Sequence, residues 1–147
     1  MLTRRESFAG AAALGLGGLT GHALGQPERT ARNDAATKLV VLWSSADPDV
    51  AHRVALMYTH ASKQLGWWEE VELILWGPSQ RTYAGDKDLQ AKVQEMINDG
   101  ISVRACVACA NSFGLVDRLK ELGLPVLGMG GPLTEFLKDP NVAVITF

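Results

Sequence analysis

The sequence is short of cysteine, of net charge and of basic clusters, and each shortage excludes a class of protein. It has 147 residues and 2 cysteines, too few for the disulfide framework that stabilises small secreted domains. Two cysteines are also too few for a Cys-only zinc site, and no histidine pair follows them at zinc-finger spacing. The net charge is −2 and basic residues do not cluster, so we expect no nucleic-acid partner. We also expect no metal and no cofactor.

The remaining composition is that of one folded domain. Hydrophobic residues are 47% of the chain and charged residues 20%, which is typical of a globular domain with a sizeable core. A chain of 147 residues favours a single domain, which we assign to residues 38–147.

The first 25 residues have the pattern of an export signal. Arg4 and Arg5 open it, an apolar Ala/Gly/Leu run follows over residues 9–19, and small residues at 23–25 suit a cleavage site. The arginine pair is typical of a twin-arginine signal peptide, which predicts export to the periplasm. A retained anchor is the alternative, but the run is shorter than the ~20 apolar residues of a span, so we expect no membrane span after cleavage. Residues 26–37 are polar and mixed, which predicts a disordered leader.

The rest of the chain alternates strand and helix patterns. Apolar runs predict five strands, at residues 38–43, 71–76, 101–105, 126–129 and 142–147. Helical spacing of apolar residues predicts helices between them, the last a short one after Pro132. This strict alternation predicts an α/β fold, a three-layer sandwich with a five-stranded, mainly parallel sheet flanked by helices.

Three local expectations follow from the same patterns. Asp47 caps a first helix that begins at Pro48 and buries a stripe made of Val50, Val54, Tyr58, Ala61 and Leu65. Residues 80–85 form a loop. The glycines of residues 128–131 form a turn at positive φ.

The two cysteines lie where a parallel sheet binds its ligands, beyond the carboxyl ends of the strands. Cys106 and Cys109 follow the third predicted strand as a C-x-x-C pair at the start of a helix, where free backbone N–H groups favour a thiolate. Four further residues are candidates for binding at this edge: Arg81, His52, Asn111 and Gly130.

Each of these four residues has an alternative role. Arg81 is either an anion contact at a strand end or a solvated loop charge. His52 either faces the cysteine edge from the first turn of its helix or is an ordinary surface histidine. Asn111, or Ser112 beside it, can cap the third helix. Gly130 either contributes to an amide nest for an anion or only to a turn.

The C-x-x-C pair is compatible with three chemistries. The first is a structural disulfide, which an exported protein forms readily. The second is a thiol–disulfide redox pair of the thioredoxin kind, although Ala-Cys-Val-Ala-Cys-Ala lacks the usual Trp-Cys-Gly-Pro context. The third is a persulfide carrier, in which one thiolate accepts a sulfane sulfur and passes it on. Spacing alone leaves all three open.

Four parts of the chain share a pattern with a known family. They are the opening strand at residues 38–44, Leu-Trp-Gly-Pro-Ser at 75–79, the cysteine segment at 103–111, and Met-Gly-Gly-Pro-Leu-Thr at 129–134 with the final strand. Together they resemble the DsrE/DsrF-like family, which includes the TusD-type sulfur-relay subunits. The resemblance implies a small parallel α/β domain, assembly into trimers or hexamers, and a reactive cysteine after the third strand, where Cys106 stands.

The sequence and the resemblance together predict an exported protein that handles sulfur. Cys106 is the expected persulfide-bearing nucleophile. Cys109 is a resolving or second thiol, expected to be the more acidic one because it lies nearer the helix N-terminus. The partners are then a sulfur donor and a sulfur acceptor protein, and the chain forms a homo-trimer or hexamer. Trp67 and Trp68, which follow the first helix, either pack against the core or an edge or form a subunit contact. The alternatives are a non-catalytic oligomeric binding module with a structural disulfide and a thiol–disulfide oxidoreductase.

Overall fold

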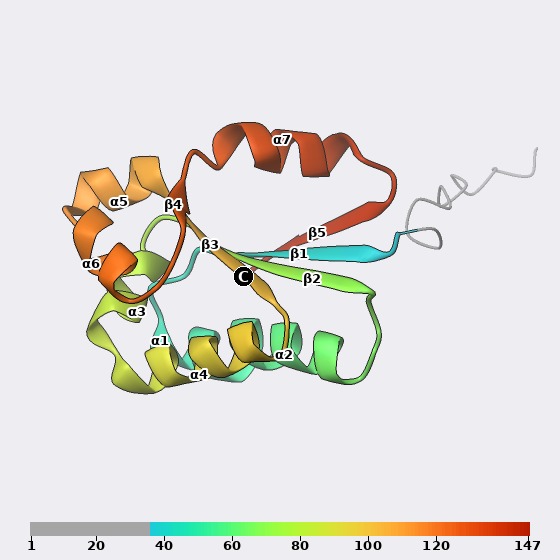
Figure 1. The fold of residues 1–147 in the computed structure, drawn as a ribbon, viewed down its shortest axis with the longest axis horizontal. Coiled ribbons are helices and arrows are strands. Elements are labelled where there is room, and N and C mark those ends of the chain that lie inside the picture. The colour runs from blue at the N-terminus through green and yellow to red at the C-terminus, as the bar shows by residue number, and fades with distance from the viewer. Residues whose placement is uncertain (1–35) are drawn as a thin grey trace, which may run out of the picture.

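The computed structural model describes residues 36–147, so the predicted signal peptide and nearly all of the predicted leader lie outside the described residues. Five strands form one sheet in the order β4-β3-β2-β1-β5, and every neighbouring pair is parallel (Figure 1). The predicted α/β fold is confirmed. The strands are β1 (Lys38–Trp43), β2 (Glu70–Leu75), β3 (Ser102–Cys106), β4 (Val126–Leu127) and β5 (Val142–Thr146).

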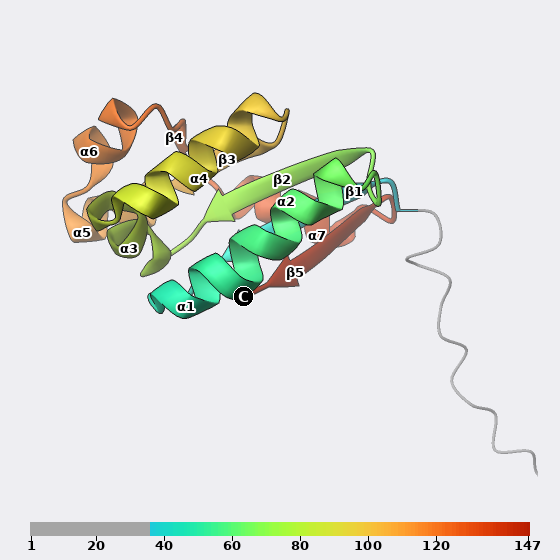
Figure 2. The same cartoon turned by 90° about the horizontal axis from the view of Figure 1, so that it is seen from below.

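Helices cover both faces of the sheet, but unequally. Figures 1 and 2 show α2 and α4 on one face, α7 on the other, and α5 and α6 near the short strand β4. The helices are α1 (Pro48–Val50), the π-helical turn η1 (Ala51–Ala55), α2 (Leu56–Gln64), α3 (Ser79–Gly85), α4 (Lys87–Asn98), α5 (Val107–Phe113), α6 (Val116–Glu121) and α7 (Gly130–Lys138). Among residues 36–147, none of these helices is long and apolar enough to cross a membrane.

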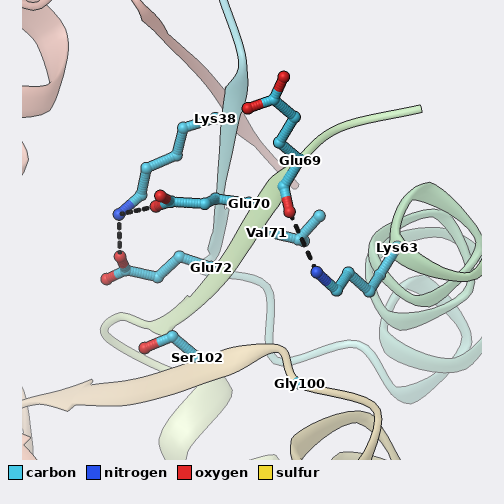
Figure 3. A pocket seen from close by; sticks show the side chains of 8 residues that line it. All are labelled: Lys38, Lys63, Glu69, Glu70, Val71, Glu72, Gly100 and Ser102. Atoms are coloured by element: carbon cyan, nitrogen blue, oxygen red, sulfur yellow. Dashed lines mark hydrogen bonds and ion pairs between the residues drawn. The ribbon is translucent and has the colours of Figure 1, made fainter. Parts of the chain in front are cut away.

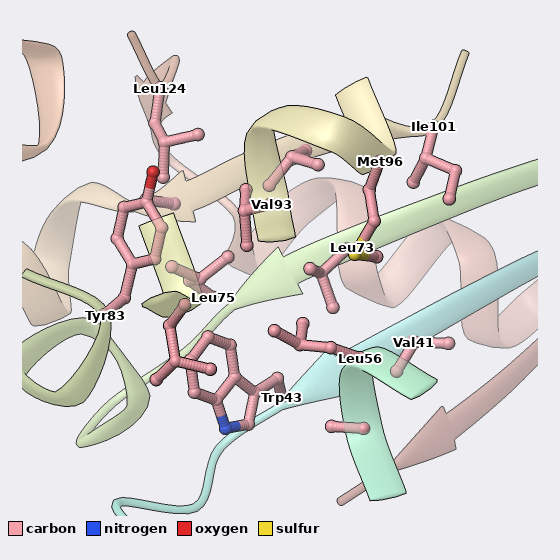
Figure 4. Close-up of a cluster of buried hydrophobic side chains, with 14 of the residues drawn as sticks. Val41, Trp43, Leu56, Leu73, Leu75, Tyr83, Val93, Met96, Ile101 and Leu124 are labelled. Carbon is pink, nitrogen blue, oxygen red and sulfur yellow. The ribbon is translucent and has the colours of Figure 1, made fainter. Parts of the chain in front are cut away.

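The larger hydrophobic core lies between the sheet and the helices α2 and α4. Successive side chains of a strand point to opposite faces, so every second residue of β1 and β2 enters this core. Trp43 and Leu73 are buried there against Leu56 of α2 and against Val93 and Met96 of α4 (Figure 4). The residues that α4 buries in this core are Leu89, Val93 and Met96.

A smaller core lies on the opposite face, beneath α7. Its buried members are Val40, Ile74, Cys106 and Met129, with Phe136 of α7 packed against them. No residue of α7 is buried, so this face is only thinly covered by the described part of the chain. The same alternation that sends Trp43 and Leu73 to the larger core sends Cys106 here.

The first helix begins as predicted but buries a different face. Asp47 is the N-cap, and its side chain accepts hydrogen bonds from the backbone N–H groups of Asp49 and Val50. The buried residues are Ala51, Ala55, Leu56, Thr59, His60 and Ser62, whereas Val54 and Leu65 of the predicted stripe are exposed. The buried face is thus displaced by one residue from the apolar stripe, and the π-helical turn η1 rotates the residues after it.

Polar residues on that helix are buried because the backbone satisfies their hydroxyls. Thr59 Oγ1 donates to the Ala55 carbonyl at 2.6 Å, and Ser62 Oγ donates to the Tyr58 carbonyl at 2.7 Å. A hydroxyl bonded within its own helix carries little penalty for burial. The apolar stripe was therefore a misleading guide to the core-facing side.

Three other local predictions were wrong. Residues 80–85, expected as a loop, belong to helix α3, which begins immediately after β2. Asn111 and Ser112, expected as helix caps, lie inside α5, whose N-cap is Cys106. The glycines of residues 128–131 are not at positive φ, because α7 begins directly at Gly130 and Met129 already has helical dihedral angles.

We predict that Leu73→Ala lowers the free energy of unfolding by about 2–5 kcal/mol, because the site is closely packed between β2 and the helices. Denaturant titration followed by circular dichroism measures this change. The matched control is Leu137→Ala on the exposed side of α7, which should stay within about 0.5 kcal/mol of the wild type. Equal effects of the two substitutions would contradict this assignment of the core.

Candidate functional site

The cysteine pair lies where β3 ends and α5 begins. Cys106 is both the last residue of the strand and the N-cap of the helix, with an extended backbone at φ −74° and ψ 117°. Cys109 follows in the first turn of α5. The strand and the helix are joined without an intervening loop, so the positions of both sulfurs are fixed by regular structure on either side.

The two thiols are free and differ in exposure. Cys106 is 3% exposed and packs with Val40, Ile74 and Met129, whereas Cys109 is partly exposed beside the same cluster. Cys109 packs against the cluster that contains Cys106, and the Cys106 thiol is near enough to influence the pKa of Cys109. A reagent from solution therefore meets Cys109 first, with Cys106 directly behind it.

Burial raises the pKa of the Cys109 thiol above its ordinary value, and the neighbouring Cys106 thiol raises it further. The backbone N–H of Gly77 acts in the opposite direction, because it donates toward the Cys109 sulfur. The helix N-terminus therefore does not make Cys109 an acidic thiol, contrary to the expectation from its position in the sequence.

The Trp76–Ser79 turn after β2 brings Gly77 to the cysteines. Gly77 has φ +60°, a conformation that residues with a side chain rarely adopt. The Ser79 hydroxyl closes the turn, accepting from the Trp76 N–H at 3.1 Å and donating to the Trp76 carbonyl at 3.0 Å. Nothing in the sequence pattern distinguished Gly77 from the other turn glycines.

Gln80 fixes the cysteine segment from the buried side. Its Nε2 donates to the carbonyl of Leu75 and to the carbonyl of Cys106, both at 3.0 Å, and so joins the ends of β2 and β3. The side chain is fully buried, and its Oε1 has no partner among residues 36–147. Gln80 was not predicted as a site residue because residues 80–85 were expected to form a loop.

Arg81 lies on α3 near the cysteine helix. Its guanidinium carbon is 4.7 Å from the ring centroid of Phe113 at the end of α5, a cation–π contact that joins the two helices. Arg81 is exposed, which leaves the cation available to an anion at this edge. Asn111 is also exposed, two residues beyond Cys109 on α5.

His52 and Gly130 have different surroundings. His52 lies on the α2 side of the sheet, with its Nε2 3.7 Å from the Asp86 carboxylate at the start of α4, so the structure does not bring it to the cysteines. Gly130 begins α7 directly after Met129, which packs with Cys106. Of the four expected binding residues, Arg81, Asn111 and Gly130 lie on elements that border the cysteine pair.

A charged hollow lies at the opposite edge of the sheet, at the amino ends of β1, β2 and β3 (Figure 3). Lys38 Nζ bonds Glu72 at 3.0 Å, and Arg104 Nε donates to the same carboxylate at 2.7 Å. The Phe136 ring lies over both cations, with its centroid 4.8 Å from Lys38 Nζ. The charges of Lys38, Glu72 and Arg104 thus satisfy one another at this edge.

A second polar cluster joins α2 to the end of α4. His60, Glu95 and Asp99 each place a potential ligand atom within 4.8 Å of the others. His60 Nε2 is 2.6 Å from Asp99, Gln64 donates to the same carboxylate, and Lys92 pairs with Glu95. The hydrogen bond from His60 lowers the pKa of Asp99. His60 and Gln64 thus join α2 to Asp99 at the end of α4, whereas Glu95 pairs with Lys92 of its own helix.

The fold and the site define a class: a parallel α/β domain with a C-x-x-C dithiol at the carboxyl edge of its sheet. A solved structure of a conserved protein of unknown function from Bacteroides thetaiotaomicron is 36% identical, with a TM-score of 0.71. The match covers 76% of this chain and 95% of that one. The chain belongs to the same family as that protein. Neither a protein-family model nor a curated protein matches the sequence.

We predict that iodoacetamide modifies Cys109 before Cys106. Peptide mass spectrometry over time should find the Cys109→Ser protein alkylated about tenfold more slowly than the Cys106→Ser protein. The thiol that remains in Cys109→Ser is the buried Cys106, whereas Cys106→Ser keeps the partly exposed Cys109. Because the pKa of Cys109 is raised, its alkylation rate should still be rising with pH at pH 9.0, the ordinary value for this thiol. A rate plateau near neutral pH would contradict the raised pKa.

We predict that Glu72→Ala costs about 2–4 kcal/mol of unfolding free energy, since Lys38 and Arg104 lose their common buried partner. The cost is moderated because both cations retain some contact with water. Glu70→Ala is the control: its side chain also pairs with Lys38 but is 72% exposed, and its effect on unfolding should be negligible. Thermal melts of both variants at matched pH test the difference.

Proposed function

We propose that this protein is an exported carrier of sulfane sulfur that uses Cys109 and Cys106 as its working thiols. The observation that carries the proposal is the arrangement of the pair: two neighbouring free thiols, one partly exposed and one buried. The resemblance of the cysteine segment and the strand ends to the DsrE/DsrF-like family supports the same function.

In the first step, the Cys109 thiolate attacks the outer sulfur of a donor persulfide. An S–S bond forms on Cys109, the S–S bond of the donor breaks, and the donor leaves as a thiol after taking up the proton lost by Cys109. Discharge is the reverse exchange with an acceptor thiolate. No net oxidation occurs in either step, so the carrier requires only a donor and an acceptor, which we propose to be proteins.

Cys106 stores the sulfur in this scheme. Its thiolate attacks the outer sulfur of the Cys109 persulfide by the same exchange, which moves the sulfur into the cluster with Ile74 and Met129. There the persulfide is shielded from water and from thiols in solution. This order assigns Cys109 the entry step and keeps the expected persulfide on Cys106.

The remaining parts of the proposal rest on the sequence and the resemblance. The twin-arginine pattern supports a periplasmic location, and the resemblance supports a homo-trimer or hexamer. Arg81 and the start of α7 at Gly130 border the thiols and are the groups we propose for contact with an anionic donor, with Asn111 beside them.

A thiol–disulfide oxidoreductase is the second candidate, favoured by the closeness of the two thiols. In that case the pair cycles between dithiol and disulfide. A measured reduction potential separates a redox catalyst from an inert bridge, because structural disulfides typically lie below about −300 mV.

The test is intact-protein mass spectrometry before and after incubation with polysulfide. We expect the wild type to gain one sulfur, about 32 Da, which is removed by dithiothreitol. Cys109→Ser should load at least about tenfold more slowly, and Cys106→Ser should load but lose the sulfur faster to added thiol. Trp67→Phe, away from the cysteines, is the control and should load normally.

Two results would overturn the carrier function. One is a persistent loss of two hydrogens, with no loading of any form, which would leave a disulfide-bearing module. The other is loading that survives replacement of both cysteines.

A further inference from the structure

Strand β5 is an edge of the sheet with an unusual composition. Its five residues, Val142–Thr146, pair with β1 on one side, and among residues 36–147 no strand pairs with the other side. Edge strands that stay unpaired in solution commonly carry charges, proline or a bulge. β5 has neither a charged residue nor a proline, and its register with β1 is unbroken.

The backbone directions on β5 follow from the hydrogen bonds at its end. The Phe147 N–H donates to the Leu42 carbonyl at 3.0 Å, and the Phe147 carbonyl accepts from Ser44 at 2.8 Å, so Phe147 faces β1. Backbone groups alternate along a strand, so Val144 and Thr146 direct both N–H and C=O to the free side. The strand therefore offers two residues with complete donor and acceptor pairs.

An apolar surface flanks this free edge. Ile145 stands beside Val41 in the sheet and so points to the α2 side. The Tyr58 ring of α2 lies 6.0 Å from the Phe147 ring and 6.2 Å from the Trp67 ring, which ties α2 to the edge. Five of the seven large exposed hydrophobic residues of the described chain lie on η1, on α2 and the turn after it, or on β5, and we name these five the β5 flank: Val54, Met57, Leu65, Trp67 and Ile145.

The β5 flank explains the stripe that the sequence analysis assigned to the core. Val54, Tyr58 and Leu65 do share one side of the helix, but that side lies toward the free edge and not toward the sheet. An apolar stripe next to unpaired backbone groups is typical of a surface that another chain covers.

We propose that the β5 flank binds a second copy of this chain across a two-fold axis, with the two β5 strands antiparallel. In this register Val144 and the partner's Thr146 exchange N–H···O=C bonds, as do Thr146 and the partner's Val144. Ile145 then lies opposite the partner's Ile145, on the axis. One sheet of ten strands results from the two five-stranded sheets.

A second copy fits better than an unrelated partner because the surface is self-complementary. A two-fold contact places the same patch on both sides, and here the axis at Ile145 brings each α2 stripe toward the other. In this register the N–H and C=O groups that Val144 and Thr146 direct to the free side all have partners in the second copy. The assembly must then contain an even number of chains, so a hexamer is compatible with this contact and an isolated trimer is not.

The position of the axis gives a direct test by cross-linking. Directly opposed residues of this type lie about 4.5 Å apart between Cα atoms, within the range that a disulfide bridges. We use the full chain with Cys106→Ser and Cys109→Ser, and add Ile145→Cys. Mild oxidation should convert this Ile145→Cys protein to a covalent dimer, which non-reducing gels detect. Leu127→Cys in the same background is the control, as it is similarly exposed but lies on the opposite edge strand, β4, and should remain monomeric.

Sedimentation of unlinked variants tests the same contact without cysteine chemistry. Thr146→Pro removes an outward N–H and Met57→Glu places a charge in the flank, and each should weaken self-association at least about tenfold. The controls are Thr146→Val, which keeps the N–H, and Leu137→Glu, an exposed position on α7. Circular dichroism verifies that each variant is folded. If Thr146→Pro does not fold, Met57→Glu still tests the contact, because this substitution leaves the β5 strand unaltered.

Three outcomes would overturn the proposal. They are a wild-type chain that stays monomeric across the concentration range, an assembly with an odd number of chains, and equal cross-linking of the Ile145→Cys and Leu127→Cys proteins. None of these outcomes depends on sulfur transfer, so this contact and the proposed function stand or fall separately.

Discussion

The alternation of side chains across the central strands is the constraint on which the rest of the structure depends. Each residue of β1, β2 and β3 belongs to one face or the other, and the two faces have different covers. Trp43 and Leu73 pack in the larger core against α2 and α4, whereas Ile74 and Cys106 lie on the face that α7 covers only thinly. Because side chains alternate along β3, the Cys106 thiol at its end points to the face that α7 covers only sparsely.

Neighbouring residues fix the position of the cysteine pair, and burial disfavours ionisation of its Cys109 thiol. Gln80 joins the backbone ends of β2 and β3, and the turn at Gly77 points an N–H toward Cys109. Burial, however, raises the pKa of the Cys109 thiol. A site of this kind suits exchange with a selected, docked partner better than rapid reaction with small oxidants in solution, because an ionised thiol is the reactive form.

The sequence predicted the topology and the position of the thiols, because strand alternation and the order of elements are local signals. It did not predict which side of the first helix is buried. The stripe through Val54 and Leu65 has the spacing of a helix, but the neighbouring side of the helix is the buried one. On that side Ala51 and Ala55 allow the helix to approach the sheet closely. It also missed Gln80, because a buried amide between two carbonyls is a property of strands brought together in space. His52 was expected either at the cysteine edge or on the surface, and it lies exposed beside Asp86 at the start of α4.

The ion cluster under Phe136 has a consequence for how the sheet aligns. Lys38, Glu72 and Arg104 come from three adjacent strands, and each cation is a diagonal neighbour of the carboxylate in the observed pairing. A slip of two residues between strands would return every apolar side chain to its own face, so hydrophobic burial discriminates weakly against it. A slip that moved Lys38 opposite residue 68, or Arg104 opposite residue 76, would separate the buried carboxylate from its cations, whereas the opposite slip would keep them together. The charges on the thinly covered face thus oppose slips in one direction, which the burial of apolar side chains alone does not.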